Sequence, residues 1–307
     1  MTITDLRPPS VRGKTGSQGS SSTKRRRRFL SRRGGFALLL LIGLVGGFLL
    51  AGSRGNKNNV GVSAKFIPPN MHLVYDSTFD STIINPPPFS TCLPWSNTLA
   101  GCSNFGNPEL QWFLPSQVSI SGGTLNLVAS KLPVTGIGAH GAPEVYPWRS
   151  GIITTFDSFK FTYGYVQFTA QVPSGSGLWS TFWMLPTSKS WPPEIDIAAI
   201  LGSSSNKVSA FYHPAGQGPV VQANTLSSHS YSNGWHTYAL DWEPGSLAWY
   251  VDGHKFKQYN GPTPSVPMYL LADLAVENVF DAGPNASTPA NATLAIKEIK
   301  VYQKTAP

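Results

Sequence analysis

Short apolar runs separated by turn residues extend from about Met71 to Gln303, without a long stretch of 3.6-residue periodicity. The segment 165–172 alternates strictly. Valine, phenylalanine, alanine and valine share one side, while tyrosine, glutamine, threonine and glutamine share the other. Because successive side chains of a β-strand point to opposite faces, this pattern predicts strands rather than helices.

Two turn signals define hairpins within this region. Gly122-Gly123 separates the runs 118–120 and 125–128, and Asp252-Gly253 follows the apolar run 249–251. Both dipeptides are typical of two-residue hairpin turns, because they tolerate positive φ angles.

Alternating runs at 236–242 and 294–302 add further strands. Aromatic residues make up 12% of the chain and charged residues only 12%, with 30 glycines and 26 prolines among 307 residues. This composition favours a turn-rich all-β protein, and the strand spacing predicts a sandwich of two packed antiparallel sheets.

The net charge of +8 is concentrated near the N-terminus. Residues 1–35 contain ten Lys/Arg and one acid, a net of +9, which leaves 13 Lys/Arg and 14 acids, a net of −1, elsewhere. The main region is therefore close to neutral, and we expect no nucleic-acid partner.

The basic segment precedes twenty residues without a charge, 34–53. That length suits a transmembrane signal anchor, and the positive-inside rule then places the N-terminus in the cytoplasm and the main domain outside. We expect a disordered tail at 1–33, a linker at 54–70 and the β-sandwich domain at 71–307. A cleaved signal peptide, which would yield a secreted protein, is the alternative.

Cys92 and Cys102 are the only cysteines. In an exported protein, a disulfide between them is the expected state, and two unpaired thiols are the alternative.

Two carboxylates lie two residues apart in the run Trp191-Pro-Pro-Glu-Ile-Asp-Ile197. On a strand, Glu194 and Asp196 share one face and the isoleucines fill the core behind them. Mutual repulsion between such close carboxylates is tolerated mainly where it sets a pKa. The neighbouring Trp191 offers an aromatic surface, and this combination indicates chemistry on sugars.

Tyr163 to Gly202 resembles glycoside hydrolase family 16, the laminarinase-like β-glucanases. The resemblance is carried by Val172-Pro-Ser-Gly-Ser-Gly-Leu-Trp-Ser-Thr-Phe-Trp-Met-Leu-Pro186 followed by the carboxylate run. Trp235-His-Thr-Tyr-Ala-Leu-Asp-Trp242 and Trp249-Tyr-Val-Asp-Gly253 are similar to later strands of that family.

This resemblance implies a concanavalin A-like jelly-roll sandwich with an open cleft, and retaining hydrolysis of a β-linked polysaccharide such as β-1,3- or β-1,3-1,4-glucan. It implies that Glu194 is the nucleophile and that Asp196 holds and tunes it. The family's motif, Glu-x-Asp-x-Glu or a bulged Glu-x-Asp-x-x-Glu, ends in an acid/base glutamate. Here that position is Ala199 in the bulged register and Ala198 in the unbulged one.

A retaining glycosidase needs both a nucleophile and an acid/base, so we expect hydrolysis to be impaired unless a substitute acid comes from elsewhere. His213 and Glu277 are candidates, although His213 is also expected as a cleft residue and Glu277 as a surface carboxylate. A non-catalytic cell-surface glucan-binding protein is the alternative function.

Further substrate contacts are expected from Trp179, Trp191, His213 and Glu109, whereas Trp183 is expected in the core. We expect no cofactor, and a structural calcium ion on the sandwich is left open.

Overall fold

The computed structural model describes residues 66–79, 89–95, 109–138, 141–216 and 218–305. The expected cytoplasmic tail and membrane segment, and Cys102, lie outside these residues. Cys92 packs beside a small apolar cluster, and its disulfide with Cys102 stays a prediction. Among the described residues, no helix is long and apolar enough to cross a membrane.

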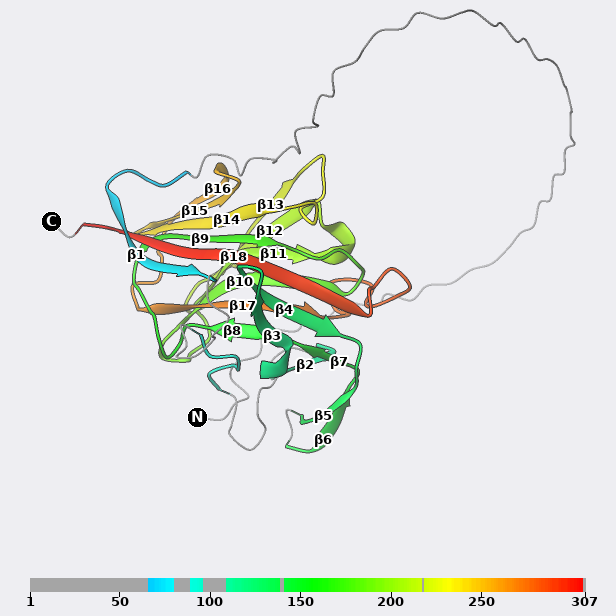
Figure 1. The fold of residues 1–307 in the computed structure, drawn as a ribbon. Coiled ribbons are helices and arrows are strands. Elements are labelled where there is room, and N and C mark those ends of the chain that lie inside the picture. Colours follow the sequence, from blue (N-terminus) through cyan, green and yellow to red (C-terminus); the bar gives the residue numbers. More distant parts are fainter. Residues whose placement is uncertain (1–65, 80–88, 96–108, 139–140, 217, 306–307) are drawn as a thin grey trace, which may run out of the picture. The chain divides into compact units, whose positions relative to one another are not determined.

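The described residues form an all-β sandwich of two stacked sheets with a small additional hairpin (Figure 1). The larger sheet has a main path of eight strands: β16 (His254–Asn260), β15 (Ser246–Val251), β14 (His236–Glu243), β9 (Gly164–Gln171), β18 (Asn291–Lys304), β4 (Thr124–Ser130), β7 (Trp148–Ser150) and β2 (Gln111–Phe113). Outside this path, β1 (Met71–Thr78) pairs with β18, and β3 (Val118–Ser121) pairs with β4.

The smaller sheet carries the candidate site. Its spatial order is β13 (Val221–Leu226), β12 (Lys207–His213), β11 (Glu194–Leu201), β10 (Leu178–Pro186), β17 (Met268–Val276) and β8 (Ile152–Thr154). The separate hairpin consists of β5 (Val134–Ile137) and β6 (Pro143–Tyr146). Two one-turn 3-10 helices, Pro115–Gln117 and Gly202–Ser204, complete the described elements.

The sequence patterns predict much of this architecture. Gly122 and Gly123 form the β3–β4 turn, and Asp252 and Gly253 form the β15–β16 turn, each with positive φ at both positions. The sheets are antiparallel as expected, except that β2 pairs with β7 in parallel.

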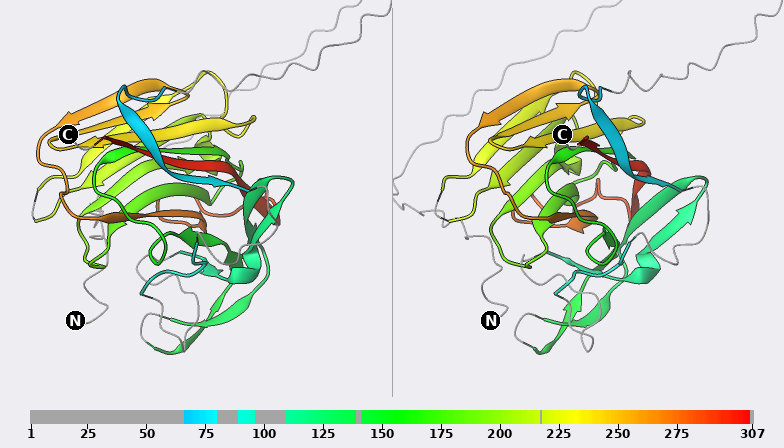
Figure 2. Two further views of the ribbon diagram at one scale, coloured as in Figure 1. Left: turned by 60° about the vertical axis from the view of Figure 1, so that its left-hand side comes forward. Right: turned by 90° about the vertical axis from the view of Figure 1, so that its left-hand side faces the viewer.

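The main core lies between the two sheets. One apolar face of β9 packs there, as its alternation predicted, together with side chains from β10, β11 and β17. Figure 2 shows the two layers from two further sides. Because this core fills one face of the smaller sheet, its opposite face is left to form a cleft.

Candidate active site

A cleft of about 380 Å³ lies on the face of the smaller sheet that points away from the main core. The structure brings together in its lining seven of the site residues that the sequence suggested: Glu109, Trp179, Trp191, Glu194, Asp196, Ala199 and His213.

The carboxylate pair projects into the cleft from β11. Glu194 and Asp196 line the cleft, whereas Ile195 and Ile197 between and after them are buried in the main core. The Trp191 indole Nε1–H donates a hydrogen bond of 2.8 Å to Glu194 Oε2. This bond fixes the orientation of Glu194 at the point where the strand begins.

The two carboxyl groups are coupled. Burial raises the pKa of both groups, while hydrogen bonds from Trp191 and Asp196 oppose the rise in the pKa of Glu194. The charge of Glu194 adds to the rise in the pKa of Asp196. Asp196 therefore keeps its proton and donates it in a hydrogen bond to Glu194. As the pH rises, Glu194 loses its proton before Asp196 does.

A β-bulge decides which alanine faces the cleft. On β12, Asp196 pairs with Phe211 and Ala199 pairs with Ser209, so three steps along β11 match two steps along β12. Because of the extra residue, Ile197 and Ala198 both face the core, and Ala199 returns to the cleft. Of the two registers left open by the sequence, the structure has the bulged one.

The bulge also contacts the opposite sheet. Trp249 of β15 is fully buried, and its indole Nε1–H donates a 2.9 Å hydrogen bond to the backbone carbonyl oxygen of Asp196. The larger sheet thus supports the backbone that carries the carboxylate pair.

His213 lies directly beside Glu194. The two residues are partners across β11 and β12, and His213 Nε2 is 3.8 Å from Glu194 Oε1, longer than a hydrogen bond. Burial lowers the pKa of His213, which keeps its imidazole neutral near pH 7. His213 therefore fits a substrate contact better than a proton donor.

Four tryptophans line the cleft: Trp95, Trp179, Trp183 and Trp191. Trp179 makes an edge-to-face contact with Phe280 at 5.0 Å between ring centroids. Trp183, which was expected in the core, packs against a second apolar cluster and also lines the cleft, because the alternation of β10 puts Phe182 and Met184 in the main core instead. Such rings suit the apolar faces of sugars.

Glu277 is not the surface carboxylate that the sequence suggested. Its side chain is only 1% exposed, and Oε2 accepts backbone N–H bonds from Val279 and Phe280 at 2.6 and 2.7 Å. Glu277 therefore holds the loop after β17, and it is absent from the cleft lining.

The structure adds a carboxylate that sequence reasoning missed. Asp273 of β17 lines the cleft at 5% exposure, and its Oδ1 accepts hydrogen bonds from Thr181 Oγ1 at 2.6 Å and Trp183 Nε1 at 2.8 Å. Burial raises the pKa of Asp273 to about 6 against these two bonds, and the charge of Glu194 adds to the rise. In the sequence, Asp273 is the one acid within the otherwise apolar run 268–276, and this isolated charge could have identified it.

Glu194, Asp196 and His213 also form the group of possible metal ligands found among the described residues. One ligand atom from each lies within 4.8 Å of the other two.

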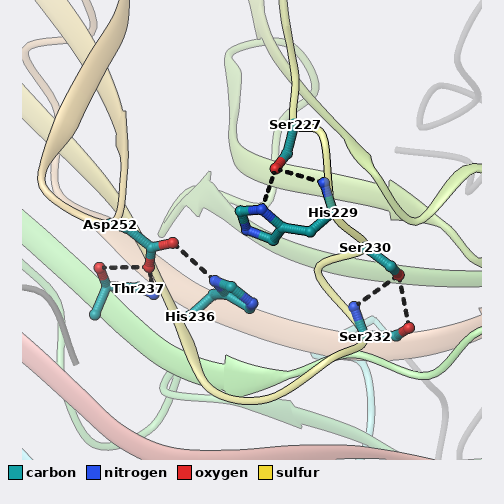
Figure 3. A network of polar contacts seen from close by, with 7 residues as sticks. All are labelled: Ser227, His229, Ser230, Ser232, His236, Thr237 and Asp252. Carbon is teal, nitrogen blue, oxygen red and sulfur yellow. Dashed lines mark hydrogen bonds and ion pairs between the residues drawn. The ribbon is translucent and has the colours of Figure 1, made fainter. Parts of the chain in front are cut away.

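A second polar cluster lies at the β14–β16 end of the sandwich (Figure 3). His236 Nδ1 contacts Asp252 Oδ2 at 2.7 Å, while Ser227 Oγ contacts Nδ1 of a different histidine, His229, at 2.9 Å. Asp252 also accepts the Thr237 backbone N–H at 2.8 Å. Since the serine and the aspartate contact different histidines, these contacts do not form a Ser–His–Asp relay, and they fasten the β15–β16 turn to β14.

Comparisons with known proteins show the family to which the chain belongs. The model of the family described as Glycosyl hydrolases family 16 matches residues 112–295, more than half of the chain. The fold and the carboxylate-lined cleft define a glycosidase-type sandwich, and the chain belongs to glycosyl hydrolase family 16.

Two curated relatives are similar over about two thirds of this chain. The endo-1,3-1,4-beta-glycanase ExsH of Rhizobium meliloti is 31% identical over 214 residues, covering 67% of this chain and 45% of the relative. The glucan endo-1,3-beta-glucosidase A1 of Niallia circulans is 33% identical over 228 residues, covering 65% of this chain and 33% of the relative. The matched region therefore spans less than half the length of these relatives.

Among solved structures, the laminarinase catalytic domain of Thermotoga maritima is similar with a TM-score of 0.68. The identity is 25%, and the match covers 77% of this chain and 100% of that domain. This likeness confirms the jelly-roll-like sandwich expected from the sequence.

Proposed function

We propose that this protein hydrolyses O-glycosyl bonds of a β-1,3- or β-1,3-1,4-glucan with retention of configuration. The observation that carries the proposal is Glu194, held by Trp191 and Asp196 in an aromatic cleft. The printed activities of the relatives, endo-1,3-1,4-β-glycanase and endo-1,3-β-glucosidase, support the substrate class.

In the proposed first step, Glu194 attacks the anomeric carbon, and a covalent glycosyl-enzyme replaces the glycosidic bond. Asp196 and Trp191 donate hydrogen bonds that favour the ionised nucleophile. The tryptophans that line the cleft stack against neighbouring sugar rings.

Reducing-sugar release from β-1,3-, β-1,3-1,4- and β-1,4-linked polysaccharides by the full chain tests this proposal. We expect release from the first two, abolition in Glu194→Gln, and a first product in the β configuration by proton NMR. A product that first appears as the α anomer would show that water attacks directly and that Glu194 is not the nucleophile.

A specific observation favours a second candidate, a glucan-binding protein without hydrolysis. Ala199 occupies the cleft position expected of the acid/base and cannot donate a proton. This function predicts saturable binding of the polysaccharide with no hydrolysis of any substrate and no covalent adduct at Glu194.

We also propose that residues 34–53 anchor the domain at the outer face of the cell membrane and that Cys92 pairs with Cys102. The uncharged length and the preceding basic residues support the anchor. The full chain should stay with membranes after a high-salt wash and dissolve in detergent, and its appearance in the salt wash would contradict the anchor. Secretion after cleavage is the alternative, which N-terminal sequencing of the mature protein detects.

A further inference from the structure

We propose that Asp273 replaces the missing acid/base: it donates the proton to the leaving group and then activates the water that releases the product. This inference rests on the proposed function, because it assigns a second carboxyl group to the same reaction.

Position is the first argument. Asp273 of β17 pairs with Thr181 of β10, and Thr181 pairs with Ala199 of β11, so the three residues form one row across the sheet. Two strand spacings, about 9.5 Å, separate the Cα atoms at the ends of this row. The side chain between them, Thr181, and the methyl group of Ala199 at one end are small, and both line the cleft.

The orientation of the carboxyl group is the second argument. Thr181 and Trp183 both donate to Oδ1 of Asp273, so the proton of the neutral acid is carried by Oδ2. Burial raises the pKa of this group to about 6, which keeps the acid protonated in mildly acidic solution. Trp183 pairs with Asp196 across β10 and β11, and its indole N–H donates to Asp273. One tryptophan therefore lies between Asp273 and the strand that carries the carboxylate pair.

The chemistry balances without a further reactant. Asp273 gives its proton to the glycosidic oxygen as the bond from that oxygen to the anomeric carbon breaks and Glu194 bonds to that carbon. The Asp273 carboxylate then takes a proton from water, the water oxygen attacks the anomeric carbon, and Glu194 leaves. Asp273 is again protonated at the end of the cycle.

The other candidate acids fit this role less well. His213 lies on the strand next to Glu194 and is kept neutral by burial, and Glu277 accepts backbone N–H groups away from the cleft lining. Glu109 lines the cleft, but it precedes β2, outside the smaller sheet, and accepts a hydrogen bond from Gln111. Asp273 is the candidate that shares a row with the vacant acid position.

The test compares Asp273→Asn with the parent full chain on two substrates. Asparagine can still accept both bonds at Oδ1, so we expect a folded protein. Hydrolysis of β-glucan should fall by about 10²- to 10⁴-fold. An aryl β-glucoside with a good leaving group needs no acid, so it should still give a burst of aryl alcohol, after which the glycosyl-enzyme stalls. Azide, a nucleophile that needs no general base, should restore turnover.

Two control variants separate this role from other effects. Asp241→Asn removes an aspartate of the larger sheet whose pKa is likewise raised to about 6 by burial, and it should leave both activities unchanged. Glu109→Gln removes the one carboxylate of the cleft lining that is neither Asp273 nor a member of the Glu194–Asp196 pair. If Glu109→Gln gives the stall and azide rescue while Asp273→Asn does not, the assignment to Asp273 is overturned.

Two further measurements extend the test. Adding Ala199→Glu to Asp273→Asn should recover glucan hydrolysis, since it places a carboxyl group at the vacant position. In the parent chain, glucan hydrolysis needs ionised Glu194, whose pKa burial raises to about 7, and protonated Asp273, whose pKa burial raises to about 6. Hydrolysis should therefore decline on both sides of this range, whereas the release of aryl alcohol should not decline on its alkaline side. This pH profile tests the proposal even if Asp273→Asn fails to fold.

The remaining outcomes are distinct. Equal losses on both substrates without azide rescue would give Asp273 a structural role and overturn the inference. A parent chain that itself bursts and stalls would keep Glu194 as the nucleophile and also overturn it. No release of reducing sugar or aryl alcohol and no adduct in the parent chain would overturn the proposed function as well.

Discussion

At the scale of single residues, the site is defined by carboxyl groups that the fold holds away from water. Burial raises the pKa of Glu194, Asp196 and Asp273, because a charged carboxylate loses its hydration in the cleft. Hydrogen bonds from Trp191, Trp183 and Thr181 recover part of this loss. Each of these protons is therefore available to chemistry at a pH where an exposed carboxyl group is already ionised.

The raised pKa of Asp273 predicts how stability depends on pH. The native acid holds its proton up to about pH 6, whereas the ordinary value is 3.8, so the native state binds more protons between these limits. The free energy of unfolding should therefore fall by on the order of 1 to 3 kcal/mol as the pH rises through this window. Urea denaturation at pH 4.5 and pH 7 measures the change.

Asp273→Asn provides the comparison for this prediction, because it removes the titrating group and keeps the hydrogen-bond acceptor. Its stability should depend less on pH over the same window, with the remaining slope coming from the Glu194–Asp196 pair. An identical slope in the variant and the parent would contradict the shifted titration of Asp273.

At the scale of elements, the β-bulge in β11 decides which side chains of that strand face the cleft. Its bulge puts Ala198 in the core and Ala199 in the cleft, although the two residues are adjacent and chemically identical. The sequence predicted the strand and the shared face of Glu194 and Asp196. It left the two alanine registers open, because the extra residue is visible only in the pairing of β11 with β10 and β12.

The bulge predicts opposite results for glutamate at the two alanines. Ala198→Glu should lower the free energy of unfolding by at least about 4 kcal/mol, because an unpaired carboxyl group enters a closed core. Ala199→Glu should retain nearly the parental stability, since its side chain projects into the cleft. Thermal and urea denaturation of the two variants test the register in solution. An Ala199→Glu variant less stable than the Ala198→Glu variant would exclude the bulge.

At the scale of the whole molecule, the two sheets have different tasks. The smaller sheet presents the cleft, and the larger sheet supports it through the core and through the Trp249 bond to the Asp196 carbonyl oxygen. Trp249 of one sheet thus positions the strand of the other sheet that carries Glu194 and Asp196.

Trp249→Phe should affect both stability and activity. Loss of the indole N–H removes a buried hydrogen bond, which costs about 1 to 3 kcal/mol, and loosens the backbone at Asp196. We expect kcat on β-glucan to fall more than KM changes, since the nucleophile and its partner lose their alignment.

Trp242→Phe is the matched control. Trp242 is also fully buried, and its Nε1–H donates a 3.2 Å bond to the Pro264 carbonyl oxygen. It should lose similar stability with an unchanged kcat. Equal effects of the two variants on kcat would show that Trp249 acts through general stability alone.

The sequence by itself determined the strands, the hairpin turns and the sharing of one face by Glu194 and Asp196. These features depend on alternation and turn chemistry between near neighbours, which local steric rules decide. It also gave the family resemblance that the comparisons confirmed.

Only the tertiary structure decided what surrounds the carboxylate pair. Asp273 and Thr181 are 92 residues apart in sequence, and Trp249 is 53 residues from Asp196. Such neighbours are set by strand pairing and by packing between sheets, which no local pattern encodes. For that reason Glu277 was wrongly expected at the surface, the cleft-lining side of Trp183 was not foreseen, and Asp273 was not identified as a residue of the cleft.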